Sequence, residues 1–316
     1  MCLPPSIRAV AIVLTACAVL MSASGCGGGT TKQKGGLTIA QRLERARKEK
    51  TPENQARELV KVARLQFKSQ DRSGAVKTLG DARRLIPADG EPTVCGPRFV
   101  EIAALFSEMG EKSPAKDVLG KARTLADAVV DPVAKAALLA DIAAVQGSKT
   151  AGLGDHAAAR RTIADARVAA ESVEERFQAK ALAAIATGCL AAGLDAEAGQ
   201  LVATLEESAR ALEQARPRVE SLVAAANVHT RRNDAAAAKA LLDEAATTAR
   251  GIEGHENRAY ALVSVAVATN ASGNRKAAVS LLAEAEKSAG KVGDADAQAN
   301  VAAKVRAAQA EIDKRK

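Results

Sequence analysis

A pattern of small and aliphatic residues recurs along this chain with a period of roughly 40 residues, and it restricts the fold more than any other feature. In the clearest copy, residues 262–286 (LVSVAVATNASGNRKAAVSLLAEAE), a small and apolar stretch is followed by a break at Gly273-Asn274 and an amphipathic stretch. One alanine of the second stretch anchors the alignment of six copies: Ala75, Ala115, Ala159, Ala198, Ala238 and Ala278. The sequence numbers of successive anchors differ by 40, 44, 39, 40 and 40.

The residues around each anchor have helical spacing. An aliphatic residue follows each anchor after four residues and a small or apolar residue after seven, which places all three on one helix face. Twelve residues before the anchor lies a small residue of the first helix: Ala63, Ala103, Ala186, Ala226 and Ala266. In the third copy the corresponding Ala143 lies sixteen residues before the anchor Ala159. The turn of this copy therefore has four additional residues, the same four that lengthen the step between anchors to 44. Because one such helix pair cannot bury its apolar face alone, successive pairs must stack. We therefore predict an all-α protein, an α-solenoid of about six helix-turn-helix repeats.

The second-helix pattern resembles the tetratricopeptide repeat. That family has Ala-x3-aromatic-x2-Ala with a glycine five residues before the first alanine, which Gly110, Gly193 and Gly273 match, with Leu, Val or Ile in place of the aromatic residue. The chain departs from the family in having no Trp and a period near 40 rather than 34. The resemblance covers roughly residues 53–290. It implies a right-handed superhelix with a binding or scaffolding role and no enzymatic activity.

The repeats and their flanking segments can be delimited. We expect the solenoid over residues 53–293, with repeats near 53–87, 97–130, 132–172, 174–214, 216–253 and 255–291. Pro52, Pro97, Pro132 and Pro217 are expected in the first turns of first helices, where proline is favoured. Residues 37–52 predict a short helix that covers the first repeat, and residues 294–316 predict a C-terminal capping helix.

The first 25 residues resemble the signal peptide of bacterial lipoproteins. Arg8 precedes a 13-residue apolar run, which is shorter than the roughly 20 residues of a membrane-spanning helix. The run ends in Ala23-Ser24-Gly25-Cys26, which resembles the lipobox, although the family prefers Leu at the place of Ala23. The resemblance implies that Cys26 is lipidated and becomes the mature N-terminus. Residues 26–36, rich in Gly, Thr and Lys, would form a flexible tether.

Two alternatives to Cys26 remain. Leu14-Thr15-Ala16-Cys17 matches the lipobox better letter by letter, but cleavage there would leave a short apolar segment before it and AVLM after it. An ordinary secretory signal cleaved near Ala23 or Ser24 is the other alternative. The favoured interpretation predicts an exported protein held on a membrane of the bacterial envelope by a lipid anchor. Gly27, rather than Asp, at the second mature position favours, by resemblance, the outer membrane facing the periplasm.

The positive charge is concentrated near the predicted tether. Residues 32–84 contain 15 Lys and Arg against 6 Asp and Glu, whereas the rest of the chain from residue 85 contains 29 and 31. This excess could meet anionic head groups or form an ordinary solvated face. Within it the family resemblance places four helically spaced residues along the groove: Arg57, Lys61, Arg64 and Lys68. They could bind a carboxylate or phosphate, but an ordinary solvated basic face is the favoured interpretation. Nucleic acid is disfavoured because an exported chain with 2 % aromatic residues has no stacking platform.

We find no catalytic or metal-binding signature in the sequence. Ser113-x-x-Lys116 and Ser288-x-x-Lys291 spell an acyl-transfer motif but lack its companion motifs, and Ser113 is expected to be a helix N-cap. Residues 152–157 (GLGDHA) resemble a dinucleotide loop without the strand that must precede it. The histidines are few and scattered: His156, His229 and His255. Cys95 and Cys189 lie two repeats apart, too far for a disulfide.

The function expected from these observations is that of a non-catalytic, lipid-anchored scaffold whose repeat surface binds protein partners. The alternative is an accessory or regulatory subunit of an envelope enzyme complex. No cofactor, metal, nucleic acid or small-molecule substrate is expected.

Overall fold

The computed structural model describes residues 37–314, apart from the side chain of Arg176, and confirms the predicted all-α solenoid. Fourteen helices and no strand lie within these residues. The predicted signal peptide, Cys26 and the tether lie outside them. No helix of the described part is both long enough and apolar enough to cross a membrane.

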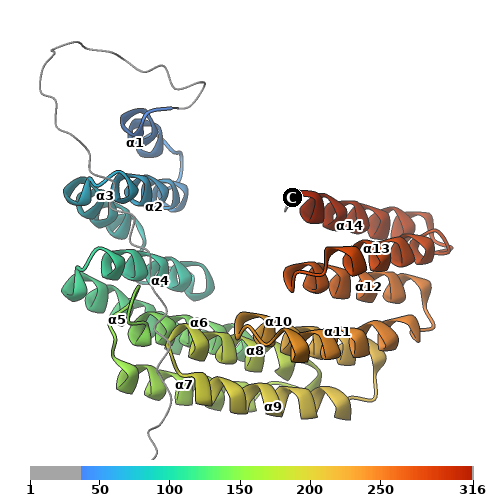
Figure 1. The fold of residues 1–316 in the computed structure, drawn as a ribbon. Helices are drawn as coiled ribbons and strands as arrows, with labels where there is room; N and C mark the ends of the chain where they lie inside the picture. Colours follow the sequence, from blue (N-terminus) through green and yellow to red (C-terminus); the bar gives the residue numbers. More distant parts are fainter. Residues whose placement is uncertain (1–36, 315–316) are drawn as a thin grey trace, which may run out of the picture. The chain divides into compact units, whose positions relative to one another are not determined.

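Twelve of the helices form six consecutive antiparallel pairs (Figure 1). The pairs are α2 (Pro52–Lys68) with α3 (Arg72–Leu85), α4 (Pro92–Glu108) with α5 (Lys112–Ala128), α6 (Pro132–Gly147) with α7 (His156–Glu171), α8 (Glu175–Ala191) with α9 (Asp195–Ala211), α10 (Ala215–Arg231) with α11 (Ala235–Arg250), and α12 (His255–Ala271) with α13 (Arg275–Ala289). Each first helix also contacts the first helix of the next pair. At the two ends, α1 (Ile39–Arg47) packs on α2, and α14 (Ala295–Lys314) packs on α12 and α13.

The core is built from the small residues that define the repeat. All six anchor alanines of the second helices are fully buried, and so are the six alanines of the first helices, from Ala63 to Ala266. The aliphatic residues four positions after the anchors, such as Leu79 and Leu242, are also buried. Alanine at a helix crossing lets the two axes approach closely, so these residues set the packing within each pair.

The turn inside each pair has one residue in the left-handed region, five positions before the anchor. Four of these residues are glycines and two are not: Gly110, Gly154, Gly193 and Gly273, and then Gln70 (φ 66°) and Asn233 (φ 60°). In four of the six turns the next residue is Asp or Asn, whose side chain accepts a hydrogen bond from a backbone N–H of the second helix. The turn therefore reverses the chain and caps the second helix within two residues.

The first helices of the third and fourth pairs approach each other unusually closely. A Cβ added to Gly188 of α8 would lie 2.6 Å from the backbone oxygen of Ala140 in α6. At the other end of the contact, a Cβ added to Gly147 would lie 2.6 Å from the backbone oxygen of Ala192. The glycines thus allow backbone-to-backbone contact between these two pairs. The four additional residues of the third repeat lie in the adjacent connection, residues 148–155.

Two local predictions are wrong. Helix α4 begins at Pro92, not Pro97, so the second repeat begins near residue 92. Pro97 lies inside the helix, where it cannot donate to the carbonyl of Thr93; both residues are exposed, so water can hydrate that carbonyl. Ser113 is the second residue of α5 and not its N-cap, which is Glu111.

Candidate functional site

The predicted basic stripe lies on α2, and all four of its residues are exposed: Arg57, Lys61, Arg64 and Lys68. Glu58 lies among them. Its Oε1 lies 2.7 Å from Lys61 Nζ and 3.6 Å from Arg57 Nε. On the neighbouring α4, Glu101 Oε1 lies 3.8 Å from Arg64 Nη2. Three of the four cations therefore already have a carboxylate nearby, which weakens the stripe as an anion site.

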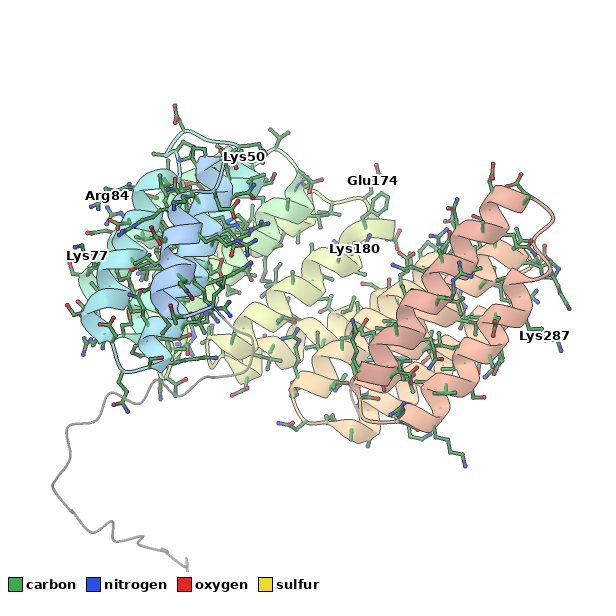
Figure 2. The ribbon with its side chains drawn as sticks, turned by 90° about the horizontal axis from the view of Figure 1, so that it is seen from above. Lys50, Lys77, Arg84, Glu174, Lys180 and Lys287 are labelled. Carbon is green, nitrogen blue, oxygen red and sulfur yellow. The ribbon has the colours of Figure 1, made fainter. Side chains whose placement is uncertain are left out.

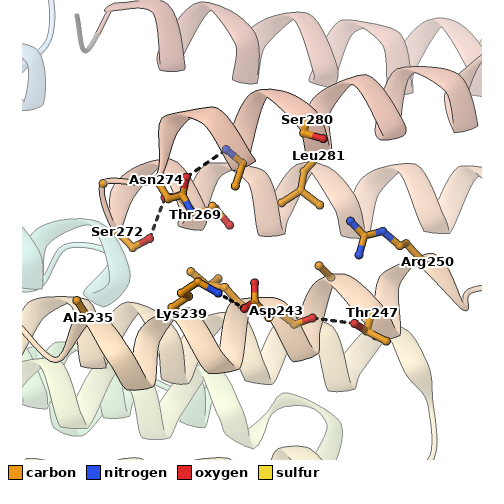
Figure 3. A pocket seen from close by; sticks show the side chains of 14 residues that line it. Ala235, Lys239, Asp243, Thr247, Arg250, Thr269, Ser272, Asn274, Ser280 and Leu281 are labelled. Atoms are coloured by element: carbon orange, nitrogen blue, oxygen red, sulfur yellow. Dashed lines mark hydrogen bonds and ion pairs between the residues drawn. The ribbon is translucent and has the colours of Figure 1, made fainter.

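A groove of about 610 Å³ lies instead between the second helices α11 and α13 (Figure 3). Leu242, Ala246 and Leu281 supply its apolar surface. The turn before α13, with Ser272 and Asn274, closes one end. The remaining lining residues are small or polar: Ala235, Lys239, Asp243, Thr247, Arg250, Thr269, Gly273, Ala277 and Ser280. The groove is open to solvent and mixes apolar surface with hydrogen-bonding groups, a composition suited to holding part of a polypeptide.

The charged groups that line this groove are already paired. Lys239 forms an ion pair with Asp243 one turn later on α11. Arg250 Nε and Nη2 donate to the two carboxylate oxygens of Glu284 at 2.7 and 2.9 Å. The hydrogen bond from Arg250 holds the pKa of Glu284 below its usual value, despite an opposing effect of burial. The groove therefore offers no excess charge to a ligand, and recognition would depend on shape, apolar contact and hydrogen bonds.

The same groove recurs one repeat earlier, between α9 and α10. It has a volume of about 410 Å³. Its eight lining residues are Gly199, Val202, Ala203, Glu206, Glu207, Arg210, His229 and Arg232. Adding 40 to the sequence number of each one gives a lining residue of the α11–α13 groove. The groove therefore occurs at the same repeat positions in two consecutive repeats, the fourth and the fifth.

His229, on the wall of the earlier groove, is held between two carboxylates. Its Nε2 lies 2.8 Å from Glu206 Oε1 on α9, and its Nδ1 lies 3.1 Å from Asp234 Oδ2. Asp234 also caps α11 by accepting from the N–H of Ala237, and this bond is the main reason that its pKa lies below the usual value. Since no Ser, Thr or Cys is among the described residues that line this groove, His229 has no nucleophile to activate there.

The glycine motif and the two cysteines of the described chain are parts of the fold rather than of a reactive site. Gly154 has a φ of 71° in the connection between α6 and α7, and Asp155 caps α7, so the motif at 152–157 spans the end of that connection and the start of the helix. Cys95 and Cys189 are buried and unpaired. Burial raises the pKa of the Cys189 thiol to about 12, which keeps it in the unreactive thiol form. Within the described residues no group of three or more His, Cys, Asp or Glu side chains could hold a metal ion.

Sequence reasoning placed the candidate surface on the first helices and missed the grooves on the second helices. A usable signal was present in the repeat register. The groove residues stand one, four, five, eight, nine and twelve positions after the anchors Ala198 and Ala238. By contrast, His229 reaches Glu206 across 23 residues, and no sequence pattern indicates that pairing.

Comparisons with known proteins add little. No protein-family profile matches the chain, and no curated protein matches it. Among solved structures, the chain is similar to the crystal structure of Ton1535 from Thermococcus onnurineus NA1, with a TM-score of 0.43 and 14% sequence identity, over 83% of this chain and 94% of that chain. A likeness at this score is too weak to bear on function.

Proposed function

We propose that this protein is a non-catalytic, lipid-anchored scaffold of the bacterial cell envelope, with a tetratricopeptide-like repeat surface that binds protein partners. The observation that carries the proposal is the groove that recurs, position by position, one repeat further along the chain. An enzyme needs one site, whereas a repeated groove suits a ligand that extends over several repeats. The charged groups that line the α11–α13 groove are engaged in ion pairs, which fits binding better than chemistry.

The lipid anchor is supported by the sequence around Cys26 and is tested by metabolic labelling. The full chain would be expressed in a bacterial host supplied with an alkyne-tagged fatty acid. We expect label on the wild type and on Cys17→Ala, and none on Cys26→Ala. The reverse pattern would assign the anchor to Cys17. If the wild type and both variants lack label, the segment is an ordinary secretory signal.

The partner-binding groove is tested by site-specific photocrosslinking in the same cells. A crosslinking amino acid at Ser280, an exposed residue that lines the α11–α13 groove, is expected to give one discrete protein adduct. The matched control is Glu286, exposed on the same helix but outside the groove lining. If both positions give the same adducts, the groove is not the binding surface.

A further inference from the structure

We infer that a basic surface on α1 and α3, formed by Arg47, Lys50, Lys77 and Arg84, docks on the anionic head groups of the bilayer that carries the anchor. This inference rests on the lipid anchoring proposed above, because the anchor is what brings the surface to a membrane. It adds which face of the protein lies against the lipid.

The surface is organised around a single carboxylate. Lys77, Asp81 and Arg84 share one face of α3, since they are four and three residues apart. Arg84 pairs with Asp81 Oδ1, and Arg47 Nη2 from α1 lies 3.7 Å from Asp81 Oδ2. Asp81 thus brings cations of two helices together but can neutralise only one of them.

The other two cations of the surface are exposed and lack an acidic partner. Lys50 follows the end of α1, three residues after Arg47, and Lys77 lies one turn before Asp81. Neither has a carboxylate within ion-pair distance among the described residues. Figure 2 shows Lys50, Lys77 and Arg84 at the end of the solenoid that contains α1 and α3, pointing away from its interior.

The rest of the described chain has no comparable excess of positive charge. Residues 38–84 contain 13 Lys and Arg against 6 Asp and Glu, whereas residues 85–314 contain 27 and 31. A bilayer with anionic lipids attracts clustered Lys and Arg, each contributing about a fivefold gain in binding. The charge therefore selects this end of the solenoid as the one that faces lipid.

Because an anchor at Cys26 would already hold the protein at the membrane, a weak interaction is enough to dock the surface. Ten residues lie between Cys26 and Leu37. A segment of that length reaches at most about 40 Å even when fully extended, so an anchor at Cys26 would keep the start of the described chain within that distance of the bilayer. Confinement near the bilayer raises the effective concentration of the surface, so three or four cations suffice for docking. Ile39 and Leu43 of α1 pack against the core, so docking is electrostatic rather than by insertion of α1.

The test is vesicle flotation of the fragment 38–316, which contains the whole compact unit and lacks Cys26. The vesicles contain phosphatidylcholine alone, or phosphatidylcholine with about 30 mol % phosphatidylglycerol to supply a negative surface potential. At low salt we expect binding only to the anionic vesicles. The triple variant Lys50→Gln/Lys77→Gln/Arg84→Gln is expected to bind about 100-fold more weakly. Molar-range salt should abolish binding of the wild type.

The matched control removes three exposed cations from the other end of the chain, Lys276→Gln/Lys287→Gln/Lys291→Gln, and is expected to change binding less than fivefold. Equal losses in the two variants, equal binding to neutral vesicles, or binding to polyglutamate without binding to anionic vesicles would each overturn the inference. The fragment has no lipid, so its result is independent of the labelling of Cys26. If the fragment floats with anionic vesicles but Cys26 is not labelled, the anchor is rejected and the docking surface is retained. If Cys26 is labelled but the fragment does not float, only the docking surface is rejected.

Discussion

Arg250 on α11 binds the carboxylate of Glu284 on α13 with two hydrogen bonds, of 2.7 and 2.9 Å, and so joins the second helices of consecutive repeats. The pair has a counterpart one repeat earlier, where Arg210 reaches Glu244 at 3.3 Å, also 34 residues apart. Glu244 and Glu284 both stand six residues after their anchors, as Asp81 does in the first repeat, where Arg84 of the same helix and Arg47 of α1 both pair with it. The contact is a repeated link between neighbouring second helices.

A double-mutant cycle of Arg250→Ala and Glu284→Ala should give a coupling free energy of about 0.5–1 kcal/mol at neutral pH, because the pair is bidentate but its side chains are 50% and 37% exposed. The pKa of Glu284 is lower in the folded protein, so this stability is fully present above the unfolded pKa of about 4.3 and is lost as the pH falls through the folded pKa. Urea unfolding at several pH values measures it. A coupling that persists in strong acid would contradict the assignment.

Replacing Gly188 with Ala should destabilise the protein by about 1–3 kcal/mol, since the new Cβ meets the backbone of Ala140. Gly120, inside α5, is the matched control because it is exposed and a Cβ there meets nothing within 4 Å. Gly120→Ala should stabilise by about 0.5–1 kcal/mol through helix propensity. Thermal unfolding compares the two. If they shift the midpoint in the same direction, α6 and α8 are not in backbone contact.

Replacing Ala226 with Leu should cost about 1–3 kcal/mol, because this fully buried alanine lies in the packed core between helices. Ala240→Lys, at an exposed position of α11, should change the free energy of unfolding by less than about 0.5 kcal/mol. Urea unfolding of both variants tests the register of the repeat. Equal effects would mean that the register is wrong.

Replacing Gln70 with Gly should stabilise the protein by about 1 kcal/mol, because Gln70 holds a φ of 66° that favours glycine. Asn233→Gly should gain less, since asparagine tolerates this conformation. The reciprocal control is Gly273→Ala, which should lose about 1 kcal/mol through φ alone, because a Cβ there has open space. A loss of stability in Gln70→Gly would show that its side chain matters more than its backbone.

The packing of each helix pair could be predicted because it depends on spacing along one helix. Ala238 and Leu242 lie on one face of α11 in any helix of this sequence, and burial of that face follows. The start of α4 could not be read in the same way. Pro92 and Pro97 both fit a first turn, and the spacing does not show that the helix begins at the first proline and continues through the second, where the carbonyl of Thr93 loses its backbone donor.

The grooves and the His229 cluster could not be predicted because they depend on how neighbouring pairs are stacked. Glu206 and His229 come from consecutive pairs, and their 2.8 Å contact exists only once α9 lies beside α10. The basic stripe of α2 illustrates the same limit. Its spacing is visible in the sequence, but the carboxylate of Glu101 beside Arg64 is supplied by the next pair.

The recurrence of the groove fixes a length scale for whatever occupies it. Packed helices are spaced by roughly 10 Å, and the second helices α11 and α13, which the groove separates, lie further apart than that; an extended polypeptide advances about 3.3 Å per residue. An extended partner that crossed successive grooves would therefore present its anchoring side chains more than about three residues apart. The number of repeats, rather than the depth of any one groove, would then set the length of the partner segment that the solenoid binds.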